Sequence, residues 1–214
     1  MNEKQSTSAV LVQELGPFAG KPVHGVTHDG EHLWVAAGAE LRAVDTDRNE
    51  VVRELPVSAD AGTAFDGTHL YQLAGEHIQK LDARSGDVVA NIPAPGKGRD
   101  SGMTWAEGTL WVGQHRDRKI HQIDPDTGAI LKTIESDRFV TGVTWTDGQL
   151  WHATWEGDAS DLRRIDPVSG AVLERYDAPE GTGIAGLCRH GQRFYCGAGP
   201  EGKVRAVVIP DATR

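Results

Sequence analysis

The sequence predicts an all-β protein, a single five-bladed β-propeller with four antiparallel strands in each blade. Three observations predict this fold. A glycine followed eight residues later by an apolar–aromatic pair recurs five times, no segment shows a long helical period, and the strand that the last copy lacks stands near the N-terminus. Repeats of about 40 residues that contain four strands each are typical of propeller blades.

The repeat begins at five glycines, and the offset to the aromatic pair never changes. The copies are Gly25 with Leu33–Trp34, Gly62 with Leu70–Tyr71, Gly102 with Leu110–Trp111, Gly142 with Leu150–Trp151 and Gly186 with Phe194–Tyr195. Successive glycines are 37, 40, 40 and 44 residues apart. We expect the glycines to mark close approach of the innermost strands near the axis. We expect the aromatic residues to pack between blades, because their rings bury a large apolar area.

Each copy reads as four strands joined by polar turns. A short first strand such as "GVTWT" leads through "DG", "EG" or "HG" to the strand with the aromatic pair, and glycine supplies the positive φ that tight hairpin turns require. The third strands end in aspartate: "LRAVD", "IQKLD", "IHQID" and "LRRID". The fourth strands are "VVREL", "VVANI", "ILKTI" and "VLERY".

The fifth copy has no fourth strand of its own, because only "DATR" follows "KVRAVVIP". The segment "VLVQEL" at 10–15 matches "EVVREL" at 50–55, so we expect it to form the outer strand of the last blade. That closure would remove open sheet edges. Residues 1–214 then form one domain, whose blades cover residues 17–56, 57–93, 97–134, 137–176 and 180–210, the last with a strand at 9–15.

Composition and charge exclude several classes of partner. The formal net charge is −9 and the basic clusters are short, which argues against a nucleic-acid partner. No segment resembles a secretory signal, and no apolar run reaches the length of a membrane helix. The two cysteines, Cys188 and Cys196, make no disulfide framework. We therefore expect a soluble, cytoplasmic, monomeric protein that binds a small molecule and neither nucleic acid nor membrane.

The third copy, "GMTWAEGTLWV" at 102–112 followed by "IHQIDPDTG" at 120–128, carries a family resemblance. It resembles a propeller superfamily that includes YncE-like and NHL-type repeats, streptogramin B lyases, gluconolactonases and glutamine cyclotransferases. The resemblance covers residues from about 10 to 210. Five blades with "IDPDTGAIL" at 123–131 look most like the glutamine cyclotransferases, which implies cyclisation of N-terminal glutamine to pyroglutamate. Streptogramin lyases are similar, and that likeness implies a metal-dependent enzyme with seven blades. No catalytic residue is transferred from either family.

The copies differ most at one end of the predicted axis, in the loops that lead into the first strand and leave the second. Three copies leave the second strand through Ala-Gly, whereas the third and fourth have Gln114–His115 and Thr154–Trp155. Sites on repeat folds lie where the copies differ. The alternative is that these are ordinary exposed loop residues. The candidate ligand-binding residues are His24, Asp60, Arg99, Gln114, Thr154, Trp155 and Glu156.

The candidate catalytic residues are His115, His152 and Asp100. His152 stands where the other copies have Val35, Gln72, Val112 and Cys196. A buried polar group without a partner costs roughly 1–3 kcal/mol. His152 is therefore either a satisfied core histidine or a base or ligand that reaches the axis, since imidazole titrates near neutral pH.

The histidines suggest two candidate metal sites. The run "HGVTHDGEH" is not expected to form one, because a strand–turn–strand structure separates His24 from His28 and His32. A cation held across blades by His24, Asp60, Asp100 and His115 stays open.

The sequence thus predicts a small-molecule-binding propeller, an enzyme of the lyase, cyclotransferase or lactonase type that acts at the axial funnel, with or without a divalent cation. The alternative is a non-catalytic protein-interaction or ligand-binding scaffold, which an exposed apolar patch on one face would mark.

Overall fold

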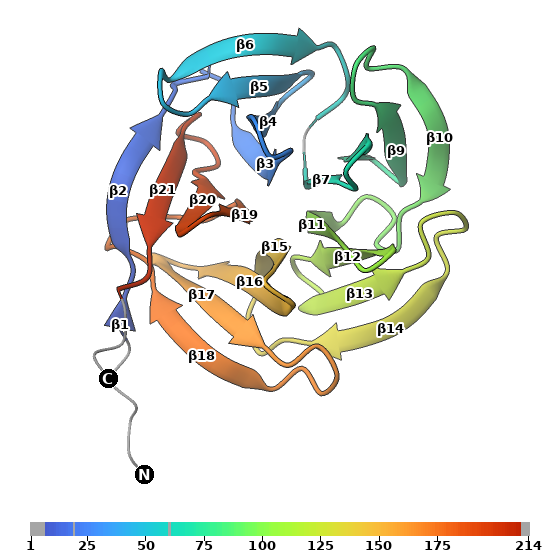
Figure 1. The fold of residues 1–214 in the computed structure, drawn as a ribbon. Coiled ribbons are helices and arrows are strands. Elements are labelled where there is room, and N and C mark those ends of the chain that lie inside the picture. The colour runs from blue at the N-terminus through green and yellow to red at the C-terminus, as the bar shows by residue number, and fades with distance from the viewer. Residues whose placement is uncertain (1–6, 19, 60, 211–214) are drawn as a thin grey trace.

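The computed structural model describes residues 7–18, 20–59 and 61–210, and it shows five sheets arranged in a ring (Figure 1). The predicted five-bladed propeller is confirmed. Blade 1 contains β3 (Val23–His28), β4 (Leu33–Ala37), β5 (Leu41–Asp45) and β6 (Glu50–Leu55). Blade 2 contains β7 (Thr63–Phe65), β8 (His69–Ala74), β9 (His77–Asp82) and β10 (Val88–Pro93). Blade 3 contains β11 (Asp100–Ala106), β12 (Thr109–Gln114), β13 (Lys119–Ile123) and β14 (Ile130–Glu135).

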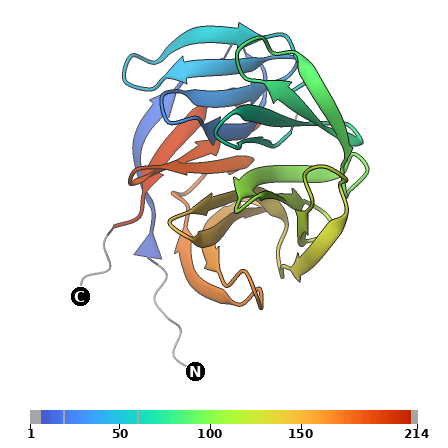
Figure 2. The same cartoon turned by 45° about the vertical axis from the view of Figure 1, so that its right-hand side comes forward.

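The last two blades carry the closure of the ring. Blade 4 contains β15 (Val140–Thr146), β16 (Gln149–Glu156), β17 (Ala159–Ile165) and β18 (Val172–Asp177). Blade 5 contains β19 (Gly186–His190), β20 (Arg193–Gly197), β21 (Val204–Val208) and, as predicted, the N-terminal strand β2 (Val10–Leu15). Strand β2 runs antiparallel to β21 along the outside of the blade (Figure 1 and Figure 2). A two-residue strand, β1 (Thr7–Ser8), also pairs in parallel with β18, so the N-terminal segment joins blade 5 to blade 4. Strand β1 was not predicted.

The five repeated glycines form a closed ring around the axis. A Cβ built on Gly102 would lie 2.6 Å from the Cα of Gly142, and one on Gly142 would lie 2.8 Å from the carbonyl carbon of Gly186. Gly186 contacts Gly25, Gly25 contacts Gly62, and Gly62 contacts Gly102 in the same way. The predicted close approach is confirmed, and backbone in contact around the whole ring leaves no channel for a ligand at this level.

The repeated aromatic residues pack between blades, as predicted. Tyr71 of blade 2 stacks on Trp105 of blade 3 at 5.4 Å between ring centroids. Trp111 of blade 3 stacks on Trp145 of blade 4 at 6.2 Å. Tyr71 and Trp111 are nearly fully buried in apolar clusters that span neighbouring sheets, and Trp105 and Trp145 are partly buried against the same clusters. Each blade therefore hides its two faces against its neighbours.

In blades 1 to 4 an aspartate at the end of the third strand holds the turn to the fourth strand. The Oδ1 of Asp124 accepts hydrogen bonds from the backbone N–H groups of Asp126 (3.0 Å) and Thr127 (2.8 Å). Asp45, Asp82 and Asp166 make the same pair of bonds. The side chain thereby satisfies backbone donors that the turn leaves unpaired. Among the described residues no helical segment has the length and apolar character needed to cross a bilayer.

Candidate functional site

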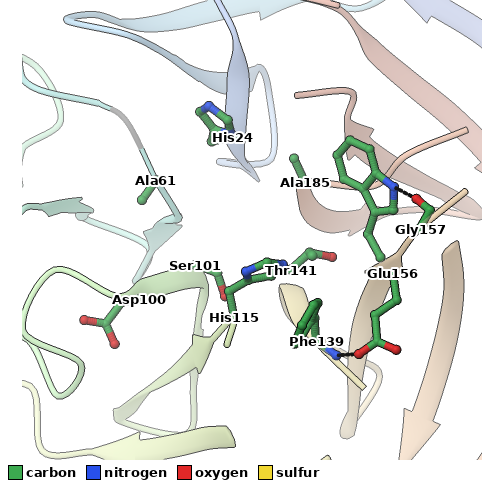
Figure 3. Close-up of a pocket in the computed structure, with 11 residues that line it drawn as sticks. His24, Ala61, Asp100, Ser101, His115, Phe139, Thr141, Glu156, Gly157 and Ala185 are labelled. Atoms are coloured by element: carbon green, nitrogen blue, oxygen red, sulfur yellow. Dashed lines mark hydrogen bonds between the residues drawn. The ribbon is translucent and has the colours of Figure 1, made fainter. Parts of the chain in front are cut away.

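A cavity of about 510 Å³ lies at one end of the axis, directly above the glycine ring. Its floor is formed by the five residues that precede the ring glycines: His24, Ala61, Ser101, Thr141 and Ala185. Its walls come from blades 3 and 4: Asp100, His115, Phe139, Trp155, Glu156 and Gly157 (Figure 3). The glycine ring closes the bottom, so a ligand would enter from one side only.

Trp155 forms a wall of the cavity that leans from blade 4 over blade 5. Its Nε1 donates a hydrogen bond to the carbonyl oxygen of Gly157 (3.0 Å). A Cβ on Gly183 would lie 2.6 Å from ring atoms of the indole, so only glycine leaves room for Trp155 there. A Cβ on Gly199 would lie 3.4 Å from the indole and 3.6 Å from the Cβ of Ala185. Gly183 and Gly199 thus leave room for the indole of Trp155, which is a large flat apolar surface.

His115 stands at the centre of the opposite wall, against Phe139. The two ring centroids are 4.7 Å apart and the planes are tilted by 47°. The guanidinium of Arg118 lies over the Phe139 ring, 4.9 Å from its centroid. Burial, and then the charge of Arg116, lower the pKa of His115 below its usual value. A neutral imidazole faces the cavity at neutral pH and can accept a proton.

Asp100 lines the cavity beside the loop that connects blades 2 and 3. Its Oδ2 accepts a hydrogen bond from the backbone N–H of Gly96 (3.0 Å), while its Oδ1 is buried on the side of Gln114. A Cβ on Gly96 would lie 2.5 Å from Oδ1, so the glycine makes room for the carboxylate. Burial raises the pKa of Asp100 to about 6, against the opposing effects of the hydrogen bonds from Gly96 and Gln114. In Figure 3 the carboxylate points away from His115.

Glu156 serves the wall of the cavity as a brace. Its Oε1 accepts hydrogen bonds from the backbone N–H of Phe139 and from Nη2 of Arg118, both at 3.0 Å. The carboxylate therefore points at Phe139 and not into the cavity centre (Figure 3). It ties the loop before β15 to the end of β16 and fixes Phe139 beside His115.

Two floor hydroxyls were not among the predicted site residues. The Oγ of Ser101 donates to the carbonyl oxygen of Val140 (2.7 Å). The Oγ1 of Thr141 is buried and has no hydrogen-bond partner among the described residues. Their position, one residue before the repeat glycine, was the signal in the sequence that could have placed them in the site.

The structure brings together five of the predicted residues and separates the others. His24, Asp100, His115, Trp155 and Glu156 all line the axial cavity. Arg99 is exposed and pairs with Asp117 at 3.0 Å. Gln114 is buried beside Asp100, within 2.7 Å of a Cβ on Gly96, behind the wall.

Two further predicted residues point into blade 4. Thr154 is fully buried, and its hydroxyl donates to Asp161 (2.7 Å), because the strand register turns it toward β17. His152, predicted to be a core histidine or an axial base, lies in a different cavity between blades 3 and 4. It does not line the axial cavity, and its buried Nδ1 has no hydrogen-bond partner among the described residues. Asp60 lies outside the described residues.

The cation site that the sequence left open can be checked for three of its four residues, because Asp60 lies outside the described residues. His24, Asp100 and His115 share the cavity, yet within residues 7–18, 20–59 and 61–210 no three histidine, cysteine or acidic side chains form a group that could hold a metal ion. The described residues therefore supply no ligand set for a cation at this site.

Comparison with known proteins shows likeness at the level of the fold. No family model matches the sequence, and no curated protein matches it either. The solved glutaminyl cyclase of Myxococcus xanthus is 17% identical, with a TM-score of 0.76 over 94% of this chain and 95% of that one. Virginiamycin B lyase of Staphylococcus aureus (17%, TM-score 0.55) matches 87% of this chain, which spans 66% of the lyase. Hydrazine synthase of Kuenenia stuttgartiensis (18%, TM-score 0.53) matches 91%, and this chain spans 58% of it. The propeller fold predicted from the repeat is common to all of them.

Proposed function

We propose that the protein is a small-molecule enzyme that uses its axial cavity for proton-transfer chemistry of the cyclotransferase, lyase or lactonase type. One observation carries the proposal. A cavity closed at its base is lined by both His115, a neutral imidazole, and Asp100, a carboxyl whose pKa of about 6 lies near neutrality. Groups that gain and lose protons near the working pH are suited to general acid–base catalysis.

The remaining side chains fit the binding of a small polar substrate. Trp155 offers a flat apolar wall, and the Thr141 hydroxyl offers a hydrogen bond that no described residue takes. In this mechanism His115 accepts the proton from the attacking group or from the carbon that loses it. A carboxyl such as Asp100 returns a proton to the leaving group once a side-chain rotation turns it toward the cavity centre. No step requires a cation.

Among the three reaction types, cyclisation of an N-terminal glutamine is the first to test. The glutaminyl cyclase structure matches 94% of this chain and 95% of its own chain. In that reaction the α-amino nitrogen attacks the side-chain amide carbon and ammonia leaves, so the site must remove one proton and deliver another. Virginiamycin B and lactones are the next substrates to test in the same panel.

The test measures turnover of a glutaminyl peptide, virginiamycin B and a lactone series by wild type, His115→Gln and His77→Gln. His77 is an exposed histidine that does not line the cavity, so it is the matched control. Loss of general-base catalysis typically costs 10²–10⁴-fold in rate. We expect a decrease of about that size for His115→Gln and none for His77→Gln. Equal activity in both variants, or no turnover with any substrate, would contradict the proposal.

The alternative, a non-catalytic scaffold, predicts an exposed apolar patch on one face. The exposed aliphatic side chains instead recur in every blade, on the fourth strands, as in Val51–Val52, Val88–Val89 and Ile130–Leu131. They are spread around the perimeter of the ring. That distribution follows from the repeat and marks no single docking face.

A further inference from the structure

A second cavity, of about 210 Å³, lies between blades 3 and 4, apart from the axial cavity. Its aliphatic lining is provided by Ile120 and Ile134 of blade 3 and by Ile165 and Val172 of blade 4. His152 and Arg163, which face each other across strands β16 and β17, supply its buried polar side. Ser136 and Asp137, on the loop between the blades, lie at its rim.

His152 is a polar residue where other blades use apolar ones or glutamine. It is 2% exposed, and its buried Nδ1 has no hydrogen-bond partner among the described residues. Burial, and then the charge of Arg163, lower its pKa to about 4, so the ring is neutral at pH 7. An unsatisfied buried nitrogen costs free energy unless something else in the cavity binds it. The Nδ1 atom is therefore available to a ligand in this cavity.

Arg163 has one firmly held edge and one edge that is easily released. Its Nε and Nη2 donate to the buried carboxylate of Asp161 at 2.8 and 3.2 Å. Its Nη1 donates to Asp137, whose side chain is 74% exposed. An ion pair with an exposed carboxylate contributes little net stability, because that carboxylate is as well solvated when released. A buried guanidinium is thus held in place by Asp161 while its outer edge faces a replaceable anion.

We propose that this cavity binds a small branched aliphatic carboxylate in place of the Asp137 side chain. The ligand carboxylate would accept hydrogen bonds from Nη1 of Arg163 and from the His152 ring, and its branched carbons would pack against Ile120, Ile134, Ile165 and Val172. Arginine suits carboxylates because its N–H groups match the spacing of the two oxygens. Arg163 would then exchange its ion pair with Asp137 for one with the ligand. This site is independent of the chemistry proposed for the axial cavity.

The experiment titrates the full-length protein with isobutyrate and follows the histidine ring signals by ¹⁵N NMR, with isobutyramide as the uncharged control. His152 is assigned by the signal that disappears in His152→Val. We expect a saturable shift of the His152 signal with isobutyrate and binding of isobutyramide about ten-fold weaker, since the amide lacks the charge-assisted bond. No saturable shift, equal affinity for the amide, or shifts confined to His24 and His115 would overturn the proposal.

Two variants separate the ligand from its competitor. Asp137→Asn removes the charge that competes for Arg163, so isobutyrate should bind several-fold more tightly. His152→Val should weaken binding, which calorimetry can follow without the ring signal. This variant is expected to fold, because Val35 and Val112 occupy the same position in blades 1 and 3. Unchanged affinity in both variants would show that the carboxylate binds elsewhere.

Discussion

At the scale of single residues, blade 4 departs from the repeat at His152, a buried imidazole where the other blades have Val35, Gln72, Val112 and Cys196. Asp161 is fully buried and pairs with Arg163 and Arg175, at 2.8 and 2.9 Å. His152 lies beside this cluster with a pKa near 4. Buried ion pairs are weak contributors to net stability unless their geometry satisfies every group. The buried imidazole of His152 therefore makes blade 4 sensitive to pH.

His152 gives a prediction with a definite sign. Its folded pKa, about 4, lies below the ordinary value of 6.5, so the unfolded chain takes up a proton between these values that the folded chain does not. Stability should be fully present above pH 6.5 and fall as the pH approaches 4. His152→Val removes this contribution. At pH 5 we expect the variant to gain about 1–2 kcal/mol relative to wild type, compared with their difference at pH 7.5.

Urea unfolding at the two pH values measures this difference. His28, whose pKa is also lowered to about 4, is retained in both proteins, so its contribution cancels. A difference between variant and wild type that does not change with pH would contradict the burial of a neutral imidazole.

The side-chain directions in the site could not be predicted from the sequence. The repeat alignment placed His24, Asp100, His115, Trp155 and Glu156 at the correct end of the axis, because strand register determines which end a loop occupies. It could not show that Asp100 turns toward Gly96 or that Glu156 braces Phe139, since both depend on loop contacts between blades. It placed Thr141 at the same end of the axis but could not show that no described neighbour satisfies its hydroxyl.

At the scale of elements, the innermost strands of the five blades approach one another closely because each has a glycine at the point of contact. Predicting the ring of glycines was possible, because the offset of eight residues to the aromatic pair is the same in all five copies. The two-residue strand β1 was not predictable, because Thr7–Ser8 has no repeat counterpart and pairs outside its own blade.

Gly102→Ala tests the ring. The added Cβ would lie 2.6 Å from backbone atoms of blade 4, which cannot move without shifting a neighbouring blade. We expect a loss of about 3 kcal/mol, the upper part of the range for overpacking. Gly108→Ala is the control: it has φ +80° in an open turn, and its strain should cost about 1–2 kcal/mol. Chemical denaturation compares the two, and a smaller loss for Gly102→Ala than for Gly108→Ala would contradict the ring.

At the scale of the whole molecule, the propeller is closed by a strand from the opposite end of the chain. Leu15 of β2 is fully buried in the cluster shared by blades 5 and 1, together with Val204 and Val26. Leu11, in the same strand, is 42% exposed. The sequence predicted this closure because "VLVQEL" repeats the pattern of a fourth strand.

Leu15→Ala should therefore cost about 2–5 kcal/mol, the usual range for a buried leucine, and should lower the unfolding temperature of the whole domain in one transition. Leu11→Ala should change stability by less than about 0.5 kcal/mol, as surface substitutions do. Calorimetry distinguishes these outcomes. A separate early transition in Leu15→Ala would show that the closing strand is not part of the cooperative unit.

If ligands bind in the axial cavity, a side chain that fills this cavity should abolish their binding. Ala185 lies on the floor beside Trp155, so Ala185→Phe would occupy the space that a ligand needs. The measurement is the shift in unfolding temperature of wild type and variant across one library of small amines, amides and lactones. We expect that compounds which stabilise wild type leave the unfolding temperature of Ala185→Phe unchanged, although the variant unfolds cooperatively on its own. Equal shifts in the two proteins would show that the ligand binds outside the axial cavity.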